Sequence, residues 1–470
     1  MFFDFHKFEG AMALSAIDGD WSYARLFTSS EEIATAVRPR SLVFLFVRNV
    51  LSAIAGYVGF LNHGIVPVMM DASIAPDLRM NLMKLYRPSY LWLPEELAGD
   101  FAAFAPILHK GSYVLLDTGE QTPYPLHADL ALLMTTSGST GSPKLVRQSY
   151  DNLRANTASI VEYLHLDETE RAVTNLPLHY VYGLSILNTH LAVGASVVVT
   201  EKTLFDRSFW QLMRDKEVTS LSGVPYTYAM LKRLRFFRMD LPALRTLTQA
   251  GGKLDPELHR EFAAFAQTHG KHFVVMYGAA EATARMGYLP PQYALEKIGA
   301  MGIAIPGGRF ELIDEAGKEI TDTDTVGELV YYGANVTLGY AMSGADLVRG
   351  DERHGRYETG DLAQRDNDGF YTVVGRKRRF LKMFGKRTNL QEVEHILRQH
   401  FGEIEVACAG IDDNLYIFVT QEELVPEIAP FLSAKLGLHH SAFTAQCIAS
   451  IPKNASGKTI YRELEQYYDV

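Results

Sequence analysis

The sequence predicts an α/β fold with a large N-terminal domain of mainly parallel sheets flanked by helices, followed by a small α+β domain. Through the first two thirds of the 470 residues, apolar runs rich in β-branched residues alternate with longer helical patterns, which is typical of parallel strands joined by helices. From about residue 300 the pattern changes to short strands separated by Gly and Asp. The chain is also longer than one hydrophobic core ordinarily supports, so at least two domains are expected.

The strands and helices of the large domain are expected to alternate along the chain. The strand patterns are "SLVFLFV", "YVLLD", "ASVVVT", "SLSGV" and "HFVVMYG", and the helical patterns cover residues 49–62, 204–216, 226–237 and 256–269. The apolar run "VLSAIAGYVGFL" (50–61) is shorter than the roughly 20 residues that span a bilayer. It therefore predicts a buried helix, and no membrane span is expected.

Antiparallel strands are expected after residue 300, from the segments "GGRFELIDEAGKEI", "GELVYYG" and "GFYTVVG". They would form a small β-barrel-like part of the large domain. The basic stretch "GRKRRFLKMFGKR" (375–387) then precedes a helix pattern, "NLQEVEHILRQHF", a strand, "LYIFVT", and a further helix. We therefore predict two domains, residues 1–377 and residues 378–470.

Charge and cysteine content narrow the range of partners and compartments. The chain has 45 basic and 55 acidic residues, a net charge of −10, which argues against nucleic acid or an anionic membrane as the main partner. Its two cysteines, Cys408 and Cys447, are too few for a disulfide framework. Both are expected to be buried packing residues, in a protein of the reducing cytoplasm.

The most specific segment is "LLMTTSGSTGSPKLV" (132–146), in which an apolar strand runs into Thr, Ser and Gly residues and then a lysine. Glycines allow the backbone to approach an anion, hydroxyl and N–H groups can surround phosphate oxygens, and Lys144 adds positive charge. A flexible linker is the alternative, but linkers seldom lie between a buried strand and an amphipathic helix. The segment therefore predicts a phosphate-binding loop.

A second Gly-Lys-Thr sequence lies near the C-terminus, in "IPKNASGKTIYREL" (451–464). A Walker loop requires another glycine five residues before the Gly-Lys pair, and that position is Pro452. Too few residues follow Thr459 to build the rest of a Walker-type sheet. The role of Lys458 must therefore be inferred from the remainder of the chain.

Together with the phosphate loop, a series of motifs resembles the adenylate-forming superfamily of acyl-CoA synthetases, peptide-synthetase adenylation domains and luciferases. "TSGSTGSPK" resembles the phosphate loop of that family. The later segments follow in the family's order: "LPLHYVYGLSI" (176–186), "LRTLTQAGGKL" (244–254), "YGAAE" (277–281), "GELVYYGANVTLGY" (327–340), "YETGDL" (357–362), "GRKRRFLKMFGKR" (375–387) and "NASGK" (454–458). The resemblance covers nearly the whole chain.

The resemblance implies a role for each matching residue. Lys458 would be the catalytic lysine of adenylation, carried on a mobile C-terminal domain, where its ammonium offsets the repulsion between a carboxylate and the α-phosphate. Glu281 would be the catalytic carboxylate that directs Mg²⁺, and Arg378 the hinge between the domains. The nucleotide would contact Thr136, Ser137, Gly138, Ser139, Thr140, Gly141, Lys144, Gly251, Gly252, Tyr277, Gly278, Asp361 and Arg376. Among these, Tyr277 would stack on adenine and Asp361 would accept hydrogen bonds from the ribose.

Several positions depart from the family pattern. Ala280 replaces the usual threonine before the glutamate of the "YGAAE" segment, which removes a hydroxyl contact to the α-phosphate. Glu358 stands where arginine is usual, and the hinge residue is arginine rather than aspartate or lysine. The small domain is also shorter than is common in CoA ligases, which leaves the acceptor of the acyl group open.

The segment after "LPL" lines the acyl pocket in the family. Members that activate amino acids have an aspartate there, which holds the α-ammonium group, and Val181 occupies that position here. An apolar side chain cannot compensate the desolvation of a buried cation, so an acid without an α-amine is predicted. The candidate substrate residues are Tyr180, Val181, Tyr182, Gly183 and Ser185. The alternative is that these aromatic residues are simply core.

The leading hypothesis is an AMP-forming acid–thiol ligase that uses ATP and Mg²⁺ to make an acyl-adenylate. The acceptor would be CoA or the phosphopantetheine of a carrier protein supplied in trans, since no carrier domain follows Val470. One alternative keeps adenylation but transfers the acyl group to an amine. Another is a degenerate member that binds nucleotide or acyl-adenylate without turnover.

Overall fold

The computed structural model describes residues 1–17, 19–121, 123–135, 144–314, 316–376, 380–402, 404–452, 459 and 461–468. These residues form two compact units, which are described separately: a large unit that extends to Val374 and a small unit that begins at Gly375. The predicted domain boundary between residues 377 and 378 falls at residues 377–379, outside the described ranges, and it remains a prediction.

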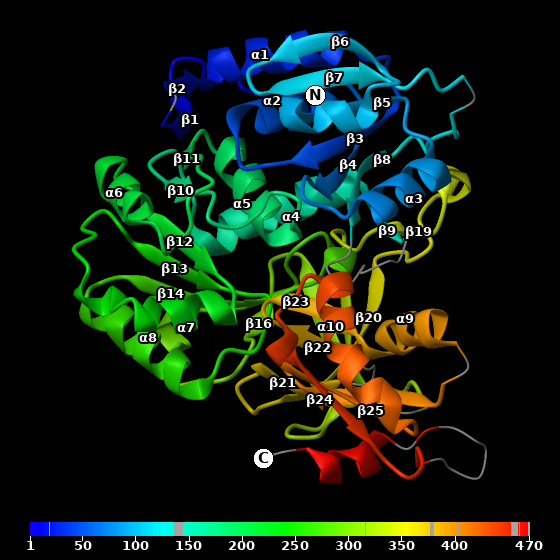
Figure 1. Ribbon diagram of the computed structural model, residues 1–470. Helices are drawn as coiled ribbons and strands as arrows, with labels where there is room; N and C mark the ends of the chain where they lie inside the picture. Colours follow the sequence, from blue (N-terminus) through cyan, green and yellow to red (C-terminus); the bar gives the residue numbers. More distant parts are fainter. Residues whose placement is uncertain are drawn as a thin grey trace. The chain divides into compact units, whose positions relative to one another are not determined.

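The large unit contains an eight-stranded sheet with parallel strands at its centre and antiparallel strands at both edges (Figure 1). β8, β4, β3 and β5 pair in parallel. In spatial order its strands are β19 (Gly339–Ala341), β9 (Leu145–Ser149), β8 (Leu130–Thr135), β4 (Val66–Asp71), β3 (Leu42–Val47), β5 (Tyr90–Pro94), β7 (Tyr113–Asp117) and β6 (Ala105–Lys110). β7, which contains "YVLLD", is antiparallel to both neighbours. It departs from the predicted parallel series because β6 and β7 form a hairpin.

A second sheet of the large unit has nine strands and is mainly parallel. In spatial order they are β16 (Ile303–Ala304), β15 (Gly287–Leu289), β14 (His272–Tyr277), β13 (Thr246–Gln249), β12 (Ser220–Gly223), β10 (Arg171–Val173), β11 (Ser196–Val198), β1 (Met12–Ala16) and β2 (Gly19–Ser22). The carboxyl ends of β13 and β14 lead directly into the predicted nucleotide motifs "AGG" and "YGAAE".

Helices cover the faces of these sheets. They are α1 (Tyr23–Thr35), α2 (Leu51–Asn62), α3 (Pro76–Tyr86), α4 (Tyr150–Leu164), α5 (Val181–Ala192), α6 (Arg207–Asp215), α7 (Pro225–Arg233) and α8 (Pro256–Thr268). Side chains of α1, α2, α4 and α5 form one core with residues of both sheets. The predicted buried helix is α2, whose residues from 52 to 61 are all buried. α6, α7 and α8 pack on the nine-stranded sheet, beside β12 to β14 in Figure 1.

β3 illustrates why parallel strands appear in the sequence as continuous apolar runs. All six of its residues are buried. Val43, Leu45 and Val47 belong to the core between the sheets. Phe44 and Phe46 belong to the core on the opposite face, together with α3. Because neighbouring side chains point to opposite faces and both faces are covered, no polar alternation is visible in the sequence.

The segment after residue 300 is antiparallel, as predicted. It forms a four-stranded sheet of β17 (Gly308–Ile313), β18 (Gly327–Gly333), β20 (Arg356–Arg365) and β21 (Tyr371–Arg376). The described residues of the small unit form two further sheets and two α-helices: β22 (Phe380–Met383), β23 (Lys386–Asn389), α9 (Leu390–Phe401), β24 (Val406–Ile411), β25 (Asn414–Val419), α10 (Val425–Leu436) and β26 (Phe443–Cys447). The predicted α/β fold with an α+β C-terminal part is confirmed.

Short 3-10 helices complete the described structure. They are η1 (Glu95–Phe101), η2 (Phe236–Arg238), η3 (Ala280–Ala282), η4 (Pro291–Tyr293), η5 (Gly344–Val348), η6 (Glu422–Leu424), η7 (His440–Ala442) and η8 (Tyr461–Tyr467). Within the described ranges, no helix combines the length and apolar character that crossing a bilayer requires. Cys408 is buried as expected, whereas Cys447 is exposed, so the packing role predicted for Cys447 is wrong.

Candidate functional site

The "YGAAE" segment follows β14 and brings two predicted site residues into contact with side chains from later in the chain. Tyr277 is the last residue of β14, and its hydroxyl donates a 2.5 Å hydrogen bond to Asp361 Oδ2 on β20. Burial, and then the Asp361 carboxylate, raise the pKa of Tyr277 well above its ordinary value. The phenol therefore stays protonated at neutral pH and holds the carboxylate in one place.

Glu281 lies in η3 and is 8% exposed. Tyr340 of β19 donates a 2.6 Å hydrogen bond from its hydroxyl to Glu281 Oε1. The Glu281 backbone carbonyl accepts bonds from the backbone N–H and the hydroxyl of Thr337, at 3.0 and 2.9 Å. Both the carboxylate and the backbone of this residue are thus held by the 337–340 segment.

Two cations lie against the ring of Tyr340. Lys144 Nζ is 3.3 Å from the ring centroid, and the guanidinium carbon of Arg353 is 4.6 Å from it. Burial and the neighbouring Glu281 raise the pKa of the Tyr340 hydroxyl. A neutral tyrosine therefore joins the phosphate-loop lysine to the proposed magnesium carboxylate. We refer to Lys144, Glu281, Tyr340 and Arg353 as the Tyr340 cluster.

The backbone after Glu281 is strained and is held by hydrogen bonds. Thr283 has φ 66° and ψ −54°, a conformation that β-branched residues rarely adopt. Its hydroxyl donates to the carbonyl of Asn335 at 2.7 Å, and the Asn335 side-chain amide donates to the carbonyls of Ala282 and Arg285 at 2.9 and 2.8 Å. Such strain persists only where surrounding contacts hold it, as is common at functional sites.

Glycines permit close backbone approaches at two of the motifs. A Cβ on Gly278 would collide with the carbonyl of Ala284. Gly251 has φ 82°, and a Cβ there would lie 2.8 Å from the hydroxyl of Tyr180. The next residue, Gly252, accepts a 2.8 Å hydrogen bond at its carbonyl from Gln249 Nε2. The loop after β13 therefore runs close to the first candidate substrate residue.

The candidate substrate residues lie at the start of α5. Tyr182 is buried and shares a 2.8 Å hydrogen bond with the Thr248 hydroxyl. The Ser185 hydroxyl donates to the carbonyl of Tyr182 at 2.7 Å. A Cβ on Gly183 would collide with the Pro177 carbonyl, so this glycine lets the "LPL" segment pack directly on the helix.

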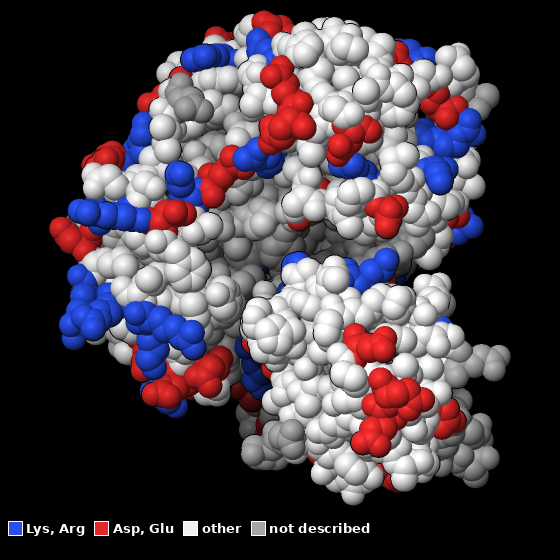
Figure 2. All heavy atoms as spheres, in the orientation of Figure 1, with Lys and Arg blue, Asp and Glu red and all other residues white. Residues whose placement is uncertain are grey.

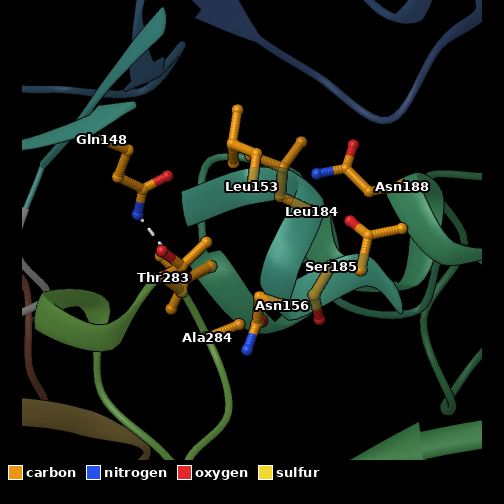
Figure 3. A pocket seen from close by; sticks show the side chains of 10 residues that line it. Gln148, Leu153, Asn156, Leu184, Ser185, Asn188, Thr283 and Ala284 are labelled. Carbon is orange, nitrogen blue, oxygen red and sulfur yellow. Dashed lines mark hydrogen bonds between the residues drawn. The ribbon is translucent and has the colours of Figure 1, made fainter. Parts of the chain in front are cut away.

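A small cavity lies between α4, α5 and the loop after Glu281 (Figure 3). Its lining residues are Gln148, Leu153, Asn156, Thr157, Val181, Leu184, Ser185, Asn188, Thr283 and Ala284. Figure 3 shows Asn156 between Ser185 and Ala284, and Gln148 Nε2 donating a 3.5 Å hydrogen bond to the Thr283 carbonyl. Val181 and Ser185 thus border a space, while Tyr182 packs on β13.

Several predicted residues cannot be placed. Lys458, Arg378 and the phosphate-loop residues Thr136, Ser137, Gly138, Ser139, Thr140 and Gly141 lie outside the described residues, as does the side chain of Arg376 at the end of β21. Among the residues that are described, no group of three or more His, Cys, Asp and Glu side chains could hold a metal ion.

Sequence reasoning did not assign roles to Tyr340, Arg353 and Arg285. Tyr340 ends the "GELVYYGANVTLGY" segment, so the sequence identified its motif but not its contact with Glu281. Its contact with Glu281 depends on the pairing of β19 with β9, which no local pattern specifies. Arg285 lies four residues after Glu281 in an apolar stretch. A charged residue is unusual in such a stretch, so its presence indicates a candidate functional residue.

Charged side chains are otherwise mixed on the surface. Figure 2 shows Lys, Arg, Asp and Glu interspersed over the visible face of the large unit. This is the distribution expected for the net charge of −10. In the described part of the chain, two rings each have two cations beside them: Lys144 and Arg353 at Tyr340, and Arg309 and Arg356 at Tyr332.

Comparison with known proteins identifies relatives. A sulfoacetate–CoA ligase of Cupriavidus necator is 30% identical over 353 residues, covering 73% of this chain and 68% of the relative. A 2-succinylbenzoate–CoA ligase of Bacillus licheniformis is 29% identical over 345 residues, covering 72% of this chain and 70% of the relative. An amide bond synthetase from Marinactinospora thermotolerans shares the fold, with a TM-score of 0.81 at 20% identity and 98% coverage of both chains.

Residues 4–341 match the family described as AMP-binding enzyme. These residues include the whole Tyr340 cluster except Arg353. The predicted adenylate-forming superfamily and the predicted class of ligase enzyme are confirmed by this match and by the named relatives. The chain belongs to the AMP-binding enzyme family.

Proposed function

We propose that this enzyme activates a carboxylic acid without an α-amine as an acyl-adenylate, with ATP and Mg²⁺, and then transfers the acyl group to the thiol of CoA. The observation that carries the proposal is the Tyr340 cluster, in which Lys144 and Glu281 contact one ring and hydroxyl. The proposal assigns Lys144 to phosphate oxygens and Glu281 to a divalent metal, and its support is that both side chains contact Tyr340. The relatives that are 29 to 30% identical are named CoA ligases, which supports the reaction class.

The first half-reaction joins the carboxylate of the acid to the α-phosphate of ATP and releases pyrophosphate. Lys144 and the 136–141 loop would hold the phosphates, and Glu281 would hold Mg²⁺, which would supply positive charge to offset that of the phosphates. Asp361 would accept hydrogen bonds from the ribose, with Tyr277 fixing its orientation. Lys458 would supply the cation between the two reacting anions.

The acid is proposed to lack an α-ammonium group because Val181 borders the cavity at the start of α5. A carboxylate at this position would be needed to compensate a buried ammonium. Gln148, Asn156 and Asn188 supply amide groups to the same cavity, and none of them carries charge.

The proposed acceptor of the acyl group is CoA. The alternative acceptors are the phosphopantetheine of a separate carrier protein and an amine. Between the two half-reactions the C-terminal domain would rotate about Arg378. Lys458 would then leave the active site and the 375–387 segment would take its place. The cytoplasmic location inferred from the cysteine content remains part of this proposal.

The test is acid-dependent exchange of pyrophosphate into ATP across aryl, short-, medium- and long-chain acids and amino acids, with Lys458→Ala as control. Exchange with non-amino acids that the variant lowers by orders of magnitude is the expected result, because the lysine acts on the reacting anions. Product analysis with CoA, a carrier protein and an amine then identifies the acceptor.

Two results would contradict the proposal. Exchange only with amino acids would contradict the substrate class. Exchange with no acid, either in the natural enzyme or in Ala280→Thr, would favour a protein that binds nucleotide without turnover. The Ala280→Thr variant is included because it restores the hydroxyl that the family usually carries.

A further inference from the structure

Arg285 is a buried cation that lacks an acidic partner. The residue is 3% exposed, and the guanidinium carbon lies 4.0 Å from the ring centroid of Tyr182. Its Nε contacts Met276 Sδ at 3.4 Å. Among the described residues no carboxylate lies at ion-pair distance from it, and neither Nη atom donates to a protein carbonyl.

The other two buried arginines in the described chain are paired. Arg147 donates to Glu352 and to backbone carbonyls, including those of Leu338 at 3.1 Å and Gly350 at 3.2 Å. Arg79 pairs with Asp100 at 2.7 Å. Burying a cation costs several kcal/mol unless an anion or several acceptors replace its water. The same fold therefore satisfies two buried guanidinium groups with protein acceptors and leaves the third without an anion.

The backbone of Arg285 is fixed from two sides. Asn156 Nδ2 donates to its carbonyl at 3.0 Å, and its N–H donates to Asn156 Oδ1 at 3.4 Å. Asn335 Nδ2 donates to the same carbonyl at 2.8 Å. In Figure 3 Asn156 lies beside Ala284, the residue that precedes Arg285. The arginine is thus anchored next to the cavity that Val181 and Ser185 border.

Three phenols are affected by the guanidinium charge, and two of them, Tyr180 and Tyr182, are candidate substrate residues. Burial raises the pKa of Tyr163, Tyr180 and Tyr182, and the charge of Arg285 opposes that rise at all three. Tyr180 also reaches the loop after β13 at Gly251. Tyr180 therefore lies both within the influence of the arginine charge and beside the loop after β13.

We propose that the acid activated by this enzyme carries a second anionic group, a carboxylate or a sulfonate, which binds Arg285 at the end remote from the carboxylate that reacts. A guanidinium can donate two parallel hydrogen bonds to such a group, and the Tyr180 hydroxyl can donate a further one. This inference rests on the proposed function, because it assigns the substrate of the same site. It makes Arg285 a specificity residue rather than a structural cation held by the Tyr182 ring.

The test compares acids of equal length that differ in one charge. Adipate and terephthalate are each paired with their monomethyl esters, and pyrophosphate exchange is measured for all four with the natural enzyme and Arg285→Met. We expect the natural enzyme to favour each dianion, and we expect the ratio of kcat/KM for dianion over ester to fall about 100-fold in the variant, since a buried charge-assisted pair is lost. Arg285→Lys should recover part of the ratio, and the exposed Arg154→Met should leave it unchanged.

Binding measured by calorimetry provides a readout that does not depend on turnover. Adipate and its monomethyl ester are titrated into both proteins, and only the dianion should bind more weakly to Arg285→Met. If no acid supports exchange but this difference in binding remains, the proposed function fails and the inference about Arg285 stands. If exchange occurs but esters match or exceed their dianions, or if Arg285→Met weakens both equally, the inference is overturned and the arginine is structural.

Discussion

The Tyr277 hydroxyl donates a hydrogen bond to Asp361 Oδ2 across 2.5 Å, which joins the end of β14 to β20. Tyr277→Phe keeps the ring but leaves the Asp361 carboxylate without this donor. Hydrogen bonds to charged groups contribute about 1.5–3 kcal/mol, so we expect the KM for ATP to rise about tenfold with little change in kcat. Tyr332→Phe removes a hydroxyl from the neighbouring strand β18 and serves as the control. Equal effects of the two substitutions would contradict the role of the contact.

Tyr340→Phe separates the hydroxyl contact of the Tyr340 cluster from its ring contacts. The variant keeps the ring beneath Lys144 but removes the 2.6 Å bond to Glu281. We expect kcat of pyrophosphate exchange to fall about tenfold, and the Mg²⁺ concentration for half-maximal rate to rise, because the carboxylate loses its orientation. Tyr340→Leu removes both contacts and should be slower still. An unchanged Mg²⁺ dependence in Tyr340→Phe would exclude a role of the hydroxyl in placing the metal carboxylate.

Arg147→Met should destabilise the large unit. The guanidinium is fully buried and donates to Glu352, whose side chain is 45% exposed, and to the carbonyls of Leu338 and Tyr340. Losing hydrogen bonds from a buried donor costs about 1–3 kcal/mol, and the exposure of Glu352 keeps the loss below that of a fully buried ion pair. Urea unfolding followed by fluorescence should show this loss, whereas the exposed Arg154→Met should change the free energy of unfolding by less than about 0.5 kcal/mol. Similar midpoints for the two variants would show that the Arg147 network contributes little.

His259 should make stability depend on pH. It is 1% exposed, its Nε2 bonds the Ala294 carbonyl at 2.9 Å, and its Nδ1 accepts from the Gly299 N–H at 3.3 Å, so both nitrogens are used by the neutral ring. Burial lowers its pKa below the ordinary value of 6.5. As pH falls below that value, the unfolded chain takes up a proton that the folded chain does not, and the free energy of unfolding decreases by up to about 1.4 kcal/mol per pH unit.

Urea unfolding from about pH 7.5 to about pH 5.5 checks the His259 prediction, because protonation of this histidine in the unfolded chain changes the free energy of unfolding over this range. The stability advantage of the natural protein over His259→Gln should shrink as pH falls. His272→Gln, at an exposed position, should show a constant difference. A constant difference for His259→Gln as well would mean that this histidine is not held neutral.

The family and fold class were readable from the sequence because the motifs are local. A strand leading into Thr, Ser and Gly, or a glycine pair after an apolar run, specifies its chemistry within about ten residues. The apolar run at 50–61 likewise located α2, and β3 appeared as an apolar run because both of its faces are covered. Features that depend on residues close together in the sequence were therefore predicted.

Contacts between distant segments could not be predicted in this way. The bond from Tyr340 to Glu281 spans 59 residues, and the stacking of Arg285 on Tyr182 joins a loop to a helix about a hundred residues earlier. The predicted parallel role of the strand at 113–117 failed for the same reason, because strand direction follows from pairing rather than from composition. The exposure of Cys447 at the end of β26 also depends on what covers that strand.

The pairing of β9 with β19 has a consequence for how the chain is made. Arg147 bonds the carbonyl of Tyr340, 193 residues later in the sequence. Ribosomes add about 5–20 residues per second, so β9 emerges roughly 10 to 40 seconds before the strand that covers its edge. Throughout that interval the paired strands β8 and β9, on either side of the predicted phosphate loop, present an open edge to other nascent chains. The proposed nucleotide site would thus be completed late in synthesis, and its assembly is the step that chaperones would need to protect.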